Sequence, residues 1–137
     1  MDEILEYFDK NKNSGIINLS HSKIKTKIND ILLQLQFQGN ELKNLHKKLK
    51  NYRYVDDLQN IETGRYIRWI NLTRQPLKLT NGGIIIEIKF LDGIHIICKN
   101  NLNHVIQLKL EENIIFQKLT DQEHIILSAI KYLENVK

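Results

Sequence analysis

The sequence predicts an α+β fold, in which a long N-terminal heptad helix precedes an antiparallel β-meander and a C-terminal amphipathic helix. Three observations predict it: a heptad pattern over 21–53, short alternating strands separated by turn residues over 65–119, and a helical apolar pattern over 121–135. A chain of 137 residues is long enough for one domain and its core, and too short for two ordinary enzyme domains.

Residues 1–20 are expected to form a mobile arm or a short helix, because an amphipathic start is followed by polar, turn-prone residues. The helix over 21–53 begins after Ser20 or Ser22, since either side chain can accept a hydrogen bond from a backbone N–H of the first turn. Its apolar side chains recur in steps of four and three, with one polar position at Gln38. The series comprises Ile24, Ile28, Ile31, Leu35, Gln38, Leu42, Leu45, Leu49 and Tyr52.

A heptad series predicts that the helix associates with another helix along one face. We expect a homo-oligomer, and packing against a different protein or against the chain's own β-region are the alternatives. Gly39-Asn40 also permits a helical hairpin, with a C-cap followed by an N-cap; we favour one helix because the heptad phase continues across Gly39. The candidate oligomerisation residues are Ile24, Ile28, Ile31, Leu35, Leu42, Leu45 and Leu49.

Residues 54–64 are expected to be a polar linker to a β-domain over 65–137. Asn81-Gly82 suits a two-residue type I′ turn, because both central positions of that turn need a positive φ, and it would pair Leu79 with Ile84. The candidate strands are 66–72, 76–80, 83–90, 94–100, 104–110 and 114–118.

Three later turns are each predicted to contain three residues, at 91–93, 101–103 and 111–113. A three-residue loop pairs Phe90 with Ile94 and keeps the apolar residues of both strands on one face, whereas a two-residue turn would separate them. Each loop ends in Gly or Asn, which tolerate the left-handed conformation that such loops need. The predicted apolar face contains Ile86, Ile88, Phe90, Ile94, Ile96, Cys98, Ile106, Leu108, Leu110, Ile114 and Phe116.

The last helix, 121–135, is predicted to open with a capping box between Thr120 and Glu123. A meander of short twisted strands with such a helix most resembles a small SH3-like or Tudor-like barrel, and an open sheet is the alternative. The outer face of the meander carries Ile85, Ile97 and Val105, which predicts partial cover by a helix or by a partner.

The net charge of +4 invites a nucleic-acid hypothesis, and the segment 21–53 concentrates it with eight basic and two acidic residues. Lysine, isoleucine and asparagine are abundant, whereas arginine occurs four times. The three abundant residues have A/T-rich codons, so codon usage is a second explanation for the lysine content.

No pattern predicts catalysis, a cofactor or a metal site. The five histidines lack paired metal-ligand spacing, and Cys98 is predicted to face the core, so we expect a non-enzymatic protein. The single cysteine also excludes a disulfide framework and indicates a reducing compartment. We find no leader after Met1 and no apolar run long enough for a membrane span, and expect no membrane partner.

The densest candidate site lies in 52–74, which contains all four arginines, the only tryptophan and three of the five tyrosines. Guanidinium groups pair with phosphate, and aromatic rings stack on bases. Trp69 is either part of such a surface or a core anchor of the first strand. The candidate nucleic-acid-binding residues are Arg53, Arg65, Arg68, Trp69, Arg74, Lys43, Lys47, Lys48 and Lys50.

Four motifs carry a family resemblance: Tyr52-Arg-Tyr-Val-Asp-Asp-Leu58, Gly64-Arg-Tyr-Ile-Arg-Trp-Ile-Asn71, Leu79-Thr-Asn-Gly-Gly83 and Ile115-Phe-Gln-Lys-Leu-Thr-Asp-Gln-Glu123. With them the chain resembles small uncharacterised proteins of giant double-stranded DNA viruses, over about residues 52–135. The resemblance implies a location in the host cytoplasm, a viral factory or a virion. It implies no activity and no site residues.

The leading hypothesis is a non-enzymatic, oligomeric module that binds nucleic acid through an Arg/aromatic surface and a basic helix. The alternative is a viral structural or scaffolding protein that binds other viral or host proteins through the barrel and the heptad helix.

Overall fold

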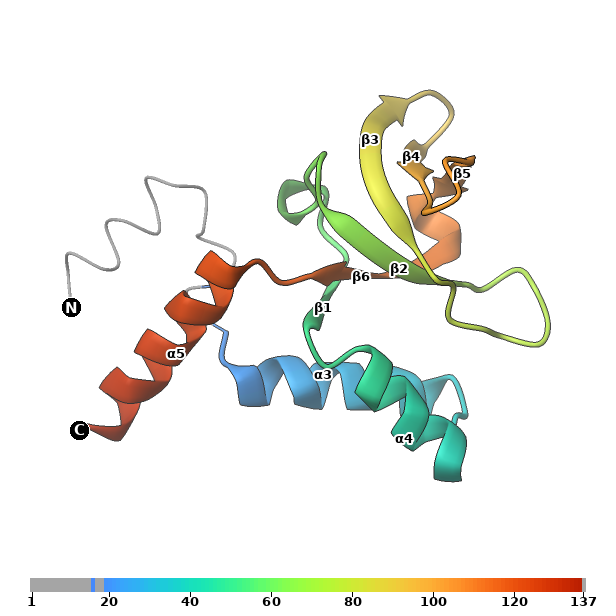
Figure 1. Ribbon diagram of the computed structural model, residues 1–137. Helices are drawn as coiled ribbons and strands as arrows, with labels where there is room; N and C mark the ends of the chain where they lie inside the picture. The colour runs from blue at the N-terminus through green and yellow to red at the C-terminus, as the bar shows by residue number, and fades with distance from the viewer. Residues whose placement is uncertain (1–15, 17–18, 137) are drawn as a thin grey trace. The chain divides into compact units, whose positions relative to one another are not determined.

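The computed structural model describes residue 16 and residues 19–136 (Figure 1). The chain divides into two compact units: a helical unit of Met1–Leu42 and Leu119–Lys137, and a β-unit formed by the continuous segment Lys43–Lys118. The arm or short helix expected over 1–20 lies outside the described residues, apart from residues 16, 19 and 20.

Helix α3 (His21–Gln34) begins at Ser20, whose side chain accepts a hydrogen bond from the Lys23 N–H at 3.1 Å. This confirms one of the two predicted caps. The helix is amphipathic, and the residues buried along its length are Ile24, Ile28, Ile31 and Leu32.

Helix α3 ends in a Schellman motif, the pair of backbone hydrogen bonds that commonly terminates α-helices. Gln36 adopts the left-handed conformation with φ +71°. The Phe37 N–H donates to the Leu32 carbonyl at 3.1 Å, and the Gln36 N–H donates to the Leu33 carbonyl at 2.9 Å. Leu32 and Phe37 are both buried, which fits the apolar contact that often accompanies this motif.

The prediction of one continuous helix over 21–53 is therefore wrong. Helix α3 stops at Gln34, α4 occupies only Gly39–Lys48, and Tyr52 opens a strand. The break precedes Gly39, at a glutamine that carries no sequence signal for a left-handed residue. Homo-oligomerisation stays a prediction, although five of its seven candidate residues are already buried in the single chain: Ile24, Ile28, Ile31, Leu45 and Leu49.

Helix α5 (Asp121–Asn135) confirms the predicted C-terminal helix and its capping box. The Thr120 hydroxyl accepts from the Glu123 N–H at 3.1 Å, and the Glu123 carboxylate accepts from the Thr120 N–H at 2.9 Å. Within the helical unit, His124 of α5 stacks on His21 of α3, with ring centroids 5.6 Å apart.

The β-unit contains a six-stranded antiparallel sheet in the order β1-β6-β2-β3-β4-β5, which is open, with β1 and β5 at its edges (Figure 1). The order differs from the predicted meander, because the last strand lies between the first two. The strands are β1 (Tyr52–Val55), β2 (Tyr66–Asn71), β3 (Gly83–Phe90), β4 (Ile94–Lys99), β5 (Val105–Lys109) and β6 (Asn113–Lys118).

Two of the predicted three-residue loops are confirmed. Phe90 pairs with Ile94 across 91–93, and β4 pairs with β5 in the predicted register across 101–103. Gly93 and Asn103 have φ of +102° and +63°, so both loops end in a left-handed residue. Turn chemistry and apolar alternation therefore predicted this part of the sheet.

A β-bulge in β3 overturns part of the predicted side-chain arrangement. The register shifts between Ile85 and Glu87, so Ile85 and not Ile86 lies opposite Cys98. Ile85 is 1% exposed and Ile86 is 48% exposed, the reverse of the prediction. Of the three residues expected on the outer face, only Val105 is exposed, because Ile97 is buried as well.

The two-residue turn predicted at Asn81-Gly82, and the strand before it, are not formed. Ile67 pairs with Gly83, whereas Ile70 makes an isolated bridge with Leu79, so the register along β2 slips by one residue between the two pairings. The additional residue is accommodated beside Gly82, which has φ +87°. Asn81-Gly82 therefore forms a bulge-like irregularity and not the expected turn. Both structures need a residue with a positive φ.

The third predicted loop, 111–113, is also wrong. Leu110–Glu112 form a short 3-10 helix, η2, after which β6 pairs with β1 and β2. This pairing reverses the expected faces of β6: Ile115 lies in the core cluster, while Ile114 and Phe116 point to the other side of the sheet.

One apolar cluster of the β-unit receives residues from all six strands. Val55 belongs to edge strand β1 and Leu108 to edge strand β5, so the open sheet must curve to bring both edges around the same core. The buried members are Val55, Ile61, Ile67, Trp69, Ile85, Ile96, Cys98, Leu108 and Ile115.

Candidate functional site

Three of the four arginines are buried or hydrogen-bonded within the β-unit. Arg53 is 6% exposed. Arg65 donates from Nη2 to the Lys118 carbonyl at 2.8 Å, and Arg68 donates from Nε to the Thr80 carbonyl at 2.8 Å. The sequence cluster therefore does not form one continuous Arg-rich surface.

Trp69 faces the core, which agrees with its interpretation as a core anchor of the first predicted strand. It is 5% exposed and belongs to the apolar cluster of the β-unit. Tyr66, three residues earlier on the same strand, points to the opposite face and donates its hydroxyl to the Asn81 carbonyl at 2.6 Å. The aromatic side chains of β2 are thus divided between the two faces of the sheet.

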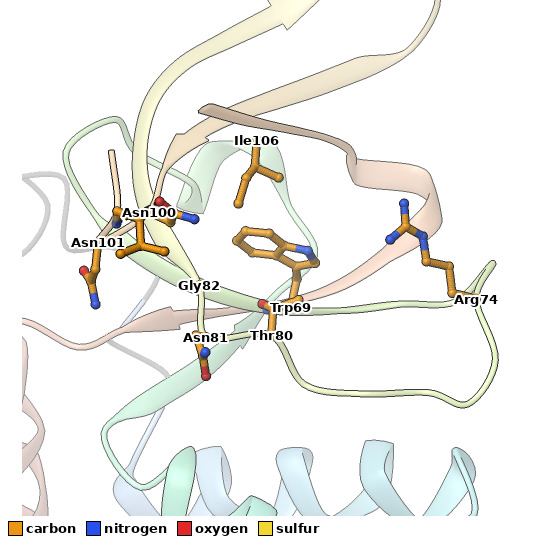
Figure 2. A pocket seen from close by; sticks show the side chains of 9 residues that line it. Trp69, Arg74, Thr80, Asn81, Gly82, Asn100, Asn101 and Ile106 are labelled. Atoms are coloured by element: carbon orange, nitrogen blue, oxygen red, sulfur yellow. Dashed lines mark hydrogen bonds between the residues drawn. The ribbon is translucent and has the colours of Figure 1, made fainter. Parts of the chain in front are cut away.

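One edge of Trp69 borders a cleft of about 400 Å³ inside the β-unit (Figure 2). Figure 2 shows the indole ring between Arg74 on one side and Asn100 and Asn101 on the other, with Ile106 beside the ring. The lining residues come from β2, the segment 72–82, the loop after β4, and β5: Trp69, Arg74, Thr80, Asn81, Gly82, Asn100, Asn101, Leu102 and Ile106.

Some polar groups of the cleft are committed to structure. The Asn100 side-chain oxygen accepts from the Leu102 and His104 N–H groups, both at 2.9 Å, and so shapes the loop after β4. The Thr80 hydroxyl accepts from the Trp69 N–H at 3.2 Å. These bonds fix the walls of the cleft.

Other polar groups of the cleft are available to a ligand. Among the described residues, the side chains of Arg74, Asn81 and Asn101 have no hydrogen-bond or ion-pair partner, and all three residues are exposed. Arg74 follows a short turn in which the Asn71 side-chain oxygen accepts from the Thr73 N–H at 2.8 Å. Arg74 is therefore the candidate arginine best placed to meet an anion.

Charge is divided unequally between the two units. The β-unit contains thirteen Lys and Arg and seven Asp and Glu, a net charge of +6, while the rest of the chain has seven and nine, a net charge of −2. The four candidate lysines are exposed, three of them on α4 and the fourth two residues beyond its end: Lys43, Lys47, Lys48 and Lys50. They add to the positive field of the β-unit.

Two further titratable groups of the β-unit, Cys98 and Glu111, have structural roles. Burial raises the pKa of the Cys98 thiol to about 12, which keeps the sulfur protonated and weakly nucleophilic. The Glu111 carboxylate accepts from the Ile94 N–H at 2.9 Å, and this hydrogen bond lowers the pKa of Glu111. Among the described residues no group of three potential ligands could hold a metal ion.

No protein family, curated protein or solved structure that was compared with the chain matches it. Within the described part of the chain, no helix has the length and hydropathy needed to cross a membrane. Sequence reasoning missed Asn81, Asn100 and Asn101 as cleft residues, because asparagines of this kind are also ordinary turn residues.

Proposed function

We propose that the protein is a non-enzymatic nucleic-acid-binding module whose β-unit supplies the binding surface. The observation that carries the proposal is the segregation of charge, with +6 on the β-unit and −2 on the rest of the chain. The nine of sixteen lysines in the β-unit match its share of the chain, 76 of 137 residues, so the difference in charge comes from the four arginines, all of which lie in that unit, and from its seven of sixteen acidic residues. A positive field on one compact unit attracts the phosphate backbone.

Two groups of side chains would meet the phosphates. Lys43, Lys47, Lys48 and Lys50 are exposed on and after α4, and Arg74 is exposed at the cleft. Each phosphate neutralised by such a side chain releases a counterion, which gives the association its entropy and makes it sensitive to salt. Arg53 is buried, and Arg65 and Arg68 are hydrogen-bonded to carbonyl groups of the β-unit, so these three contribute mainly to the field.

Our proposals on the fold family and on the origin of the protein are consistent with this function. A curved sheet whose two edges share one core supports assignment to the small SH3-like barrels, which resemble other small β-folds that bind nucleic acid on an exposed face. A giant-virus origin, with the protein in a viral factory, virion or host cytoplasm, remains our proposal. So does self-association, which light scattering on the wild type and on a Leu35→Asp variant tests directly.

The experiment is a fluorescence-anisotropy titration of labelled single-stranded and duplex oligonucleotides at several salt concentrations. The test variant replaces Lys43, Lys47, Lys48 and Lys50 with glutamine. We expect affinity to fall, and the slope of log K against log[salt] to become shallower by about 0.7 for each lost contact to a single strand.

The matched control removes the same charge from the helical unit, by replacing Lys23, Lys25, Lys27 and Lys131 with glutamine. It should keep the wild-type slope. Absence of binding at about 50 mM salt, where counterion release favours binding strongly, refutes the proposal. Equal losses in the two variants refute the assignment to the β-unit.

A second candidate function, a scaffold that binds another protein, is favoured by exposed apolar side chains on β3, β5 and the loop before β5. Ile84, Ile86, Leu102 and Val105 are 46%, 48%, 73% and 63% exposed. A pull-down from cell extract with and without nuclease separates the two functions. Partners that survive nuclease treatment and are lost in a Val105→Asp variant support the scaffold.

A further inference from the structure

The cleft beside Trp69 combines an apolar wall with polar groups that the protein leaves unused. Trp69, Ile106 and Leu102 supply the apolar surface. Arg74, Asn81 and Asn101 supply charged and amide groups that have no partner among the described residues. A site of about 400 Å³ with this division of chemistry is within the usual range for small-ligand sites.

Each unused group favours a particular part of a ligand. The Arg74 guanidinium is a planar fork of donors that matches the oxygens of a phosphate. The amides of Asn81 and Asn101 can each donate and accept, as the polar edge of a nucleobase requires. No lining residue is acidic, so nothing in the wall of the cleft repels an anion.

These groups lie in the same order as the parts of a nucleotide. Arg74 lies on one side of the indole ring and Asn101 on the other, so a ligand that reaches both must cross the apolar edge of Trp69 (Figure 2). A nucleotide has a phosphate at one end, a polar base edge at the other, and a flat ring between them. A paired base in a duplex is stacked between its neighbours and keeps its pairing edge engaged, so only an unpaired base can enter the cleft and offer that edge to the amides.

We propose that this cleft binds one unstacked nucleotide of a single strand, with its phosphate on Arg74 and the edge of its base on Asn81 and Asn101. The inference rests on the proposed nucleic-acid-binding function and adds to it a defined subsite and a preference for single strands over duplex. Bulk electrostatic attraction to the β-unit provides neither.

The experiment titrates the wild-type protein with nucleoside 5′-monophosphates, with the matching nucleosides, and with inorganic phosphate. Trp69 is the only tryptophan, so its fluorescence reports directly on ligands that enter the cleft. We expect the monophosphates to change the emission at lower concentration than either fragment. Arg74→Gln should weaken monophosphate binding about tenfold or more, because a hydrogen bond to a charged group is lost.

The matched control is Lys78→Gln, which removes one positive charge from the same 72–82 segment at an exposed residue that does not line the cleft. It should leave monophosphate binding unchanged. Asn101→Ala should weaken binding about two- to tenfold without changing its salt dependence. Equal effects of Arg74→Gln and Lys78→Gln, or phosphate that competes as well as the monophosphates do, would overturn the subsite.

The failure of this inference is distinguishable from failure of the proposed function. If single strands bind with a steep salt dependence but monophosphates leave Trp69 emission unchanged, or duplex competes as well as single strand, the subsite is refuted and the function stands. If monophosphates bind through Arg74 but no oligonucleotide binds at about 50 mM salt, the subsite stands as a free-nucleotide site and the proposed function is refuted.

Discussion

Replacing Gly82 with alanine should destabilise the β-unit far more than the same change at Gly64, although the two glycines have the same φ of +87°. A Cβ at Gly64 would meet nothing within 4 Å, so its cost is the conformational strain of a left-handed alanine, about 1–2 kcal/mol. A Cβ at Gly82 would lie 2.1 Å from the Ile67 carbonyl oxygen, a backbone atom that cannot rotate away.

Relief of that clash requires the segment around Gly82 to separate from β2. Two of the hydrogen bonds that join this segment to β2 use backbone N–H groups, from the Thr80 N–H to the Trp69 carbonyl at 3.0 Å and from the Trp69 backbone N–H to the Thr80 hydroxyl at 3.2 Å. Their loss adds about 1 kcal/mol each. We therefore expect the free energy of unfolding to fall by about 3–4 kcal/mol in Gly82→Ala.

The assay is urea unfolding followed by the fluorescence of Trp69, which is buried in the β-unit and beside the contact in question. The Gly64→Ala variant measures the backbone strain of a left-handed alanine alone. The difference in free energy of unfolding between the two variants therefore measures the clash between the added Cβ and the Ile67 carbonyl. Equal losses of stability would refute the described path of the chain between β2 and β3, and with it the position of the cleft wall.

Three further predictions follow from single residues. Gln36→Gly should stabilise the helical unit by about 1 kcal/mol, since glycine adopts the left-handed conformation without strain; thermal unfolding measured by circular dichroism tests this. Gln117→Met should lower the free energy of unfolding by about 1–3 kcal/mol, because it removes the donor to the Asn60 carbonyl at 2.9 Å. The control, Gln107→Met at an exposed residue, should lower it by less than about 0.5 kcal/mol in the same urea titrations. Partial burial and a neighbouring histidine lower the pKa of His21, so folding disfavours protonation of this residue. The free energy of unfolding should therefore be retained above pH 6.5 and decline as the pH falls through the lowered pKa. Loss of this pH dependence in His21→Gln checks the assignment.

The hairpins joining β3, β4 and β5 were predictable because their signals are local. The positive φ demanded at Gly93 and Asn103 and the alternation of apolar residues both specify the same register. The pairing of β6 was not predictable in this way. A three-residue 3-10 helix and a three-residue turn share the same polar composition, and only tertiary contacts decide that β6 joins β1 and β2.

The helix break shows a different limit. Gln36 is left-handed because the buried pair Leu32 and Phe37 stabilises the end of α3, and glutamine itself gives no indication of that conformation. The cleft shows a third limit. Arginines and tryptophan marked the right segment, but only the folded chain shows that Arg74 is the arginine left without a partner, and that asparagines from two loops line the same cleft.

The discontinuity of the helical unit has a consequence for the order in which the protein is made. The β-unit is one uninterrupted segment, so all of its strands are synthesised before α5, and their pairing does not require α5. The helical unit, in contrast, needs both ends of the chain. A nascent chain released before α5 would already contain a complete β-unit while α3 still lacked its partner helix.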